Sequence, residues 1–158
     1  MFPSVDIKTI TDSLLSRGTI VALNGPLYTM RDQSLGRFSK ERSKQELAAL
    51  DLKNSVIFFA GPTDGFSEGR LSIGPTTSGR MEPYFEFLAA QGVAGIIGKG
   101  FLSKKAQEIV LENGIYYFHA FGGAGAFYGK RTQSMELLLY PELGPEAVFK
   151  VCVREMPV

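Results

Sequence analysis

Short apolar runs alternate with amphipathic segments through the second half of the chain. The runs at 55–60, 93–97, 115–121, 135–140 and 148–153 predict strands. The segments 81–91, 103–113 and 122–130 predict helices, with Ser103 as an N-cap for the second of them. Because strands and helices alternate from residue 55 onward, the pattern favours an α/β domain with parallel pairing.

The first half of the chain has a weaker pattern. Apolar positions within 4–17 recur with helical spacing and predict a helix. Residues 19–23 predict a strand, which the breaker sequence at 24–26 (NGP) should end. The charged stretch 37–49 predicts a helix that is solvated on most of one side, and residues 61–73 predict a loop or a hairpin.

Composition limits the class of protein. The 158 residues, 1–158, most simply form one domain, and 44% hydrophobic with 21% charged residues is typical of a globular chain. The net charge of +1 gives no reason to expect nucleic acid or a membrane surface as a partner. No apolar run approaches the ~20 residues that a membrane span needs. No leader pattern is visible at the N-terminus, so we expect a cytoplasmic protein.

The chain has one cysteine, Cys152, and one histidine, His119. A single cysteine can form no internal disulfide and cannot alone hold zinc or an iron–sulfur cluster. Both residues lie in apolar runs, where we expect a core cysteine and a structural histidine rather than ligands. The sequence therefore predicts no metal site within this chain.

Two glycine-rich segments stand at the ends of predicted strands or loops. Residues 74–80 read GPTTSGR and residues 98–100 read GKG. In open α/β sheets, ligands gather beyond the carboxyl ends of the strands, so we expect Arg31, Arg80 and Lys99 to converge there. Three cations and a hydroxyl suit a small dicarboxylate, since arginine binds a carboxylate with two charge-assisted hydrogen bonds.

Structural explanations of the same residues stay open. Thr77 or Ser78 could simply cap a helix that begins near Arg80. Arg31 could form no more than an ion pair with Asp32 at a helix start. The spacing of a nucleotide-binding P-loop is absent from the sequence. The chain also offers no group that could remove a hydroxide from a substrate, so such a group would have to come from elsewhere.

The order of several motifs resembles the beta region of class I fumarate hydratase, which also occurs in L(+)-tartrate dehydratase. The motifs are YTMRD at 28–32, GPTTSGRM at 74–81, GKG at 98–100, GGA at 122–124 and ELGPEA at 142–147. The resemblance runs from about residue 19 to the end of the chain. The string GPTTSGR is its most specific part.

This resemblance implies the swivelling β/β/α domain of that family and an oxygen-sensitive hydro-lyase activity. It implies a 4Fe–4S cluster held by three cysteines of an alpha region, with one iron open to the substrate. Because this chain has one cysteine, it would be the beta subunit of a hetero-oligomer, expected to hold two alpha and two beta subunits. By motif position, Thr76 matches the threonine proposed as the base, and Arg31, Arg80 and Lys99 match residues that bind the substrate carboxylates.

The sequence departs from the family pattern at two places. The family often has a histidine where this chain has Leu35, which puts any role of that histidine in doubt and could shift the substrate away from fumarate. The loop at 63–70 is also atypical. Fumarate hydratase beta subunit is the leading hypothesis, L(+)-tartrate dehydratase beta subunit is its alternative, and a non-catalytic dicarboxylate-binding module is the alternative from another class.

Overall fold

The computed structural model describes residues 2–10, 15, 17–40, 50–63 and 71–158. The strands are β1 (Ser4–Asp6), β2 (Ala22–Thr29), β3 (Val56–Phe58), β4 (Ala60–Pro62), β5 (Ile73–Pro75), β6 (Gly95–Gly98), β7 (Tyr116–His119), β8 (Thr132–Leu139) and β9 (Val148–Pro157). The α-helices are α1 (Asp32–Lys40), α3 (Phe85–Ala90), α4 (Lys104–Glu112) and α5 (Gly125–Lys130). Short 3-10 turns cover Ile7–Thr9, Ser78–Arg80, Glu82–Tyr84 and Pro141–Glu146.

Seven of the described strands form one mixed sheet in the order β7-β6-β3-β2-β9-β8, with β1 beside the first half of β2. The pairs β3–β6 and β6–β7 are parallel, as the alternation of strands and helices from residue 55 onward predicted, and β2–β3 is parallel as well. Parallel pairing is wrong for β8 and β9, which pair antiparallel with each other. Residues 140–147 connect β8 to β9, whereas a parallel connection needs a dozen or more residues.

Three predictions for the first half of the chain are wrong. Residues 4–9 form β1 and a 3-10 turn instead of a helix, because β1 pairs with β2; 11–14 and 16 lie outside the described residues. The sequence at 24–26 does not end a strand but lies inside β2. There Gly25, at φ +113°, takes up a shift of register against β9. The helix predicted from residue 37 begins at Asp32, and its remainder at 41–49 is outside the described residues.

The later elements follow the predicted pattern closely. Ser103 caps α4, since its Oγ accepts a hydrogen bond of 3.3 Å from the Ala106 N–H. Residues 81–91 begin with a 3-10 turn and continue as α3, and Gly92 ends the helix at φ +72°. The predicted hairpin at 61–73 is confirmed by the antiparallel pair β4–β5, although 64–70 lie outside the described residues.

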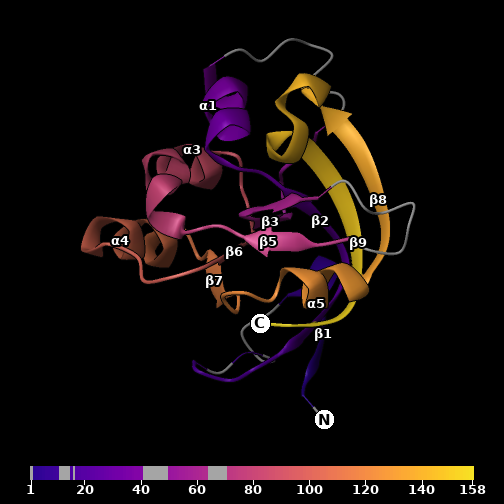
Figure 1. Cartoon of the computed structure of the whole chain (residues 1–158). Helices are drawn as coiled ribbons and strands as arrows, with labels where there is room; N and C mark the ends of the chain where they lie inside the picture. The colour runs from indigo at the N-terminus through magenta and orange to yellow at the C-terminus, as the bar shows by residue number, and fades with distance from the viewer. Residues whose placement is uncertain (1, 11–14, 16, 41–49, 64–70) are drawn as a thin grey trace.

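The apolar strands are buried on both faces of the sheet. In β3, Val56 and Phe58 join one core cluster, whereas Ile57 and the following Phe59 join the other. Helices α1, α3 and α4 lie together over the second cluster, while Tyr128 of α5 belongs to the first (Figure 1). The α/β class is confirmed, and the swivelling β/β/α arrangement stays a prediction. None of the described helices has the length and apolar character needed to cross a membrane.

Candidate functional site

The carboxyl ends of the parallel strands meet at one edge of the sheet. The Met30 N–H donates to the Phe58 carbonyl (3.1 Å), and the Phe59 N–H donates to the Ile97 carbonyl (2.8 Å). Backbone bonds thus join the segments that leave β2, β3 and β6. Arg31 and Lys99 follow β2 and β6. Thr76 follows β5 and is joined to the segment leaving β3, because its N–H donates to the Phe59 carbonyl (2.7 Å), and Arg80 lies in the next turn.

The turns that carry Thr76 and Lys99 run side by side. The Lys99 N–H donates to the Thr76 carbonyl (3.3 Å), and the Ser78 N–H donates to the Lys99 carbonyl (2.9 Å). A parallel bridge pairs Thr77 with Lys99. Among the described residues, neither the Thr76 hydroxyl nor the Lys99 ammonium has a hydrogen-bond or ion-pair partner, and both side chains are half-buried. A hydroxyl and a cation are therefore both available to a ligand.

The helix-capping explanation of residues 77 and 78 is wrong. Ser78–Arg80 is a single 3-10 turn without a side-chain cap, and the Ser78 side chain is fully buried. Its Oγ lies 2.7 Å from the Tyr117 phenol oxygen, and the Tyr117 O–H donates to the Gly100 carbonyl (2.9 Å). Because that phenol has one hydrogen, Ser78 is the donor in the first bond. The serine hydroxyl thus ties the first turn to the second.

Tyr117 is a site residue that the sequence did not identify, because it lies in the apolar run predicted as a strand. Burial raises the pKa of its phenol above the ordinary 10.0, the Ser78 hydrogen bond lowers it and the charge of Glu82 raises it. The phenol therefore stays protonated near neutral pH and remains a donor. Gly98 makes room for this contact: a Cβ there would overlap the Ser78 Oγ and lie 3.0 Å from the Tyr117 oxygen.

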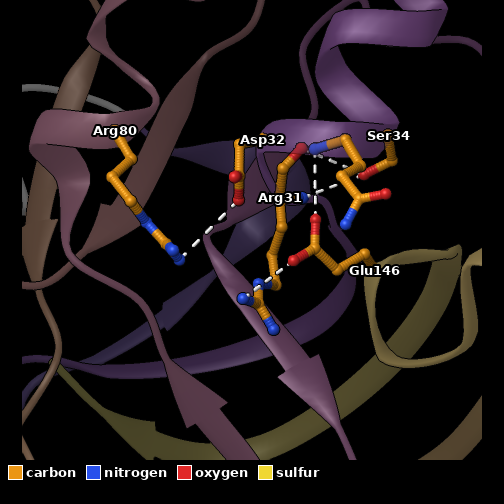
Figure 2. Close-up of polar contacts among 6 residues, drawn as sticks. Arg31, Asp32, Ser34, Arg80 and Glu146 are labelled. Atoms are coloured by element: carbon orange, nitrogen blue, oxygen red, sulfur yellow. Dashed lines mark hydrogen bonds and ion pairs between the residues drawn. The ribbon is translucent and has the colours of Figure 1, made fainter.

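Arg31 is held by an acid that sequence reasoning missed. Its Nη2 lies 2.9 Å from Oε1 of Glu146, which stands at the end of the Pro141–Glu146 turn (Figure 2). The second carboxylate oxygen accepts the Gln33 N–H at 3.1 Å. The two charged side chains are only 22% and 12% exposed, so the pair is partly shielded from water. Because 115 residues separate the partners, no local spacing could reveal the pair.

Asp32 faces Arg80 rather than Arg31. The Arg80 Nη2 lies 3.7 Å from the Asp32 Oδ1, too long for a hydrogen bond, and the Arg80 side chain is 52% exposed (Figure 2). The alternative of an Arg31–Asp32 pair is therefore wrong. The loose contact brings the 3-10 turn after Thr76 beside the start of α1, and it leaves the Arg80 guanidinium free to bind a second anion.

Residues 29–32, where β2 ends and α1 begins, hold several polar atoms without a hydrogen-bond partner among the described residues. Within the described residues, the Thr29 Oγ1, the Arg31 Nε and the Asp32 Oδ1 are buried and lack a hydrogen-bond partner. Buried polar groups in folded proteins are normally paired, and exceptions call for a bound water, an ion or a functional role. These three atoms lie within four residues of one motif, and each of them could bond to a ligand or a water molecule.

Three other residues of interest in the sequence are Leu35, His119 and Cys152. Leu35 is fully buried in the core under α1, so the position of the family histidine does not reach a substrate here. His119 is exposed at the end of β7, with its ring 5.0 Å from that of Tyr117 between centroids. Cys152 is a free, half-buried thiol in β9. Across the described ranges, no three His, Cys, Asp or Glu side chains could hold a metal ion.

Comparisons with known proteins agree with the motifs. The model of the family described as Fumarase C-terminus matches residues 4–158. Fumarate hydratase 2 of Leishmania major is 33% identical over 97% of this chain and 28% of its own length. The aerobic class I fumarate hydratase of Escherichia coli (strain K12) is 33% identical over 88% of this chain and 26% of its own length.

A third relative is matched over most of its own length. A Methanocaldococcus jannaschii protein, whose name assigns it as an L(+)-tartrate dehydratase subunit beta, is 34% identical over 89% of this chain and 75% of its own length. The chain thus spans about a quarter of the fumarate hydratases that it matches but most of this relative.

Proposed function

The chain belongs to the fumarase C-terminus family, and on this premise we propose that it is the beta subunit of a fumarate hydratase. Such an enzyme adds water reversibly to fumarate to form L-malate. The observation that carries the proposal is the side-by-side pairing of the Thr76 and Lys99 turns. It supplies a hydroxyl and a cation, neither paired with another side chain in the part of the protein that the structure describes, and Arg80 and Arg31 lie in the neighbouring segments.

The cations bind the two carboxylates of the substrate. Among the described residues Lys99 has no acidic partner, so its charge is available to a ligand without breaking an ion pair. Arg80 is half-exposed and only loosely paired, and it can turn toward a carboxylate. Arg31 keeps Glu146 as its partner and offers its remaining N–H groups.

Thr76 transfers the proton. In the dehydration direction, its Oγ1, as the alkoxide, takes a proton from the carbon next to one carboxylate. The C–H electron pair forms the C=C bond, and the hydroxide that leaves the neighbouring carbon combines with a proton to form water; hydration reverses these steps. A threonine hydroxyl is a poor base at its ordinary pKa, and a nearby cation favours its anionic form. Lys99, whose backbone pairs with that of Thr76, supplies such a charge and also favours the enolate-like charge of the transition state.

The residues described in this chain do not fit an iron–sulfur cluster, since such clusters need several thiolates and Cys152 is the single cysteine. We therefore assign the 4Fe–4S cluster to a separate alpha subunit, in a hetero-oligomer of two alpha and two beta subunits. The comparison supports a partner, because the Methanocaldococcus jannaschii relative is named as a subunit beta.

Anaerobic reconstitution with a cluster-bearing alpha partner tests the proposal. The pair should interconvert fumarate and malate, and Thr76→Ala should lower kcat by about 100-fold or more, the usual contribution of a positioned base. Thr77→Ala is the matched control, since this exposed neighbour has no side-chain hydrogen bond among the described residues. An assembled enzyme whose rate is unchanged by Thr76→Ala would contradict the assignment and indicate a structural subunit.

L(+)-tartrate dehydratase is the second candidate. The favouring observation is the 34% identity to the relative named as an L(+)-tartrate dehydratase subunit beta, over 89% of this chain. Comparing kcat/KM for fumarate, malate and L(+)-tartrate with the same reconstituted pair separates the two activities. If the isolated chain binds a dicarboxylate but no partner gives turnover, the non-catalytic binding module replaces both.

A further inference from the structure

The turns of Thr76 and Lys99 are joined by a partly buried chain of two hydroxyls in addition to their backbone bonds. Ser78 donates to the phenol oxygen of Tyr117 at 2.7 Å, and Tyr117 donates to the carbonyl of Gly100 at 2.9 Å. Tyr117 belongs to β7, so a third segment of the chain contacts both turns at once.

We propose that Tyr117 is a positioning residue that sets the distance between the Thr76 hydroxyl and the Lys99 ammonium. It acts through Ser78, two residues after Thr76, and through Gly100, directly after Lys99. This inference rests on the proposed hydro-lyase function, because it concerns the geometry of the same two groups.

The local structure is arranged to allow this contact. Gly98 precedes Lys99 and leaves no side chain between the strands; a Cβ at this position would overlap the Ser78 Oγ. Because burial keeps the phenol of Tyr117 protonated, its bond to the Gly100 carbonyl persists near neutral pH. The hydroxyls of Ser78 and Tyr117 therefore occupy the space that a side chain at position 98 would fill.

The far end of the Lys99 loop is also attached to the Thr76 side of the site. Glu82 follows the Ser78–Arg80 turn, and its Oε1 accepts the Ser103 N–H at 2.8 Å. The loop from 98 to 103 is thus held at both ends by the segment from 76 to 82. Only the Tyr117 end lies next to Lys99, so removing its hydroxyl would loosen the loop at the reactive group. A displacement of about 1 Å between reacting groups can cost on the order of 100-fold in rate.

Tyr117→Phe in the reconstituted enzyme tests the proposal, since it removes one oxygen and keeps the ring. We expect kcat to fall about tenfold or more while KM changes less, because the perturbed distance matters most in the transition state. Ser78→Ala should have the same effect, and the double variant should lose little beyond either single change, since both variants break one chain of bonds. The control is Ser55→Ala, which removes a hydroxyl bonded to the Leu52 carbonyl (2.7 Å) just before β3, at the opposite end of the strand.

A merely structural role predicts a different outcome. It predicts that Tyr117→Phe lowers the melting temperature as Ser55→Ala does while kcat stays within twofold of the wild type; this result would overturn the proposal. Losses that multiply in the double variant would also overturn it. If the wild-type pair shows no hydratase or dehydratase activity, the proposed function fails instead.

Backbone hydrogen exchange of the isolated chain decides the positioning step without an activity assay. Exchange at the amides of Ser78 and Lys99, which donate across the two turns, should become faster in Tyr117→Phe. Unchanged exchange at both amides would refute the positioning role whatever the substrate proves to be.

Discussion

Replacing Glu146 by glutamine tests how strongly the partly buried ion pair with Arg31 stabilises the fold. The carboxylate accepts one bond from the Arg31 guanidinium at 2.9 Å and one from the Gln33 N–H at 3.1 Å. Glutamine has nearly the same shape but no charge, and it offers one acceptor oxygen for these two donors. The guanidinium would stay partly buried, with its Nε already lacking a partner among the described residues.

The expected loss lies between those of exposed and fully buried ion pairs. Exposed pairs contribute about 0–1 kcal/mol, and breaking a buried pair costs about 3–5 kcal/mol. With side chains 22% and 12% exposed, we expect Glu146→Gln to lower the unfolding free energy by about 1–3 kcal/mol. At a urea slope of about 2 kcal/mol per molar, the unfolding midpoint should fall by about 0.5–1.5 M. Urea unfolding of the isolated chain, followed by circular dichroism, measures this shift.

The same 3-10 turn contains a matched control in Glu142, which pairs with Arg37. These side chains are 56% and 41% exposed, so water screens the pair and Glu142→Gln should shift the midpoint much less. The reasoning is refuted if the two variants shift the midpoint equally, or if Glu146→Gln leaves it unchanged. Either result would mean that burial does not strengthen the Arg31 pair.

Two further predictions concern stability. Gly129→Ala should lower the unfolding free energy by at least about 2 kcal/mol, because the new Cβ would overlap the Leu71 carbonyl, whereas Gly79→Ala points into open space and should have little effect on the urea midpoint. The fold should also weaken at alkaline pH. Burial raises the pKa of Tyr117 and Tyr128 above the ordinary 10.0, so the folded state keeps protons that the unfolded state loses. Their contribution is complete below about pH 10 and falls as the pH rises further; a urea midpoint that stays constant between about pH 9 and about pH 11 would disprove this.

Much of the architecture followed from local patterns. The strands near residues 56 and 96 are short apolar runs because both faces of the sheet are covered, and helix α4 has its predicted N-cap at Ser103. Where local patterns failed, pairing with distant strands had overridden them. The segment Ser4–Asp6 forms a strand because β2 lies beside it, and β2 continues through Gly25 because β9 pairs along its length.

The sequence by itself determined the chemistry available to the site. The motif at 74–80, the lysine between two glycines and the single cysteine were all readable without coordinates. These features led to an anion-binding site without cluster ligands of its own. The amino-acid sequence specifies which functional groups the chain carries, and their identity does not depend on how the chain folds.

Only the tertiary structure decided which groups touch. It paired Arg31 with Glu146, and it turned the Ser78 hydroxyl away from a helix cap and toward Tyr117. These partners lie 115 and 39 residues apart in sequence. Such contacts depend on the strand order and register of the whole sheet, which the pattern around one residue does not encode.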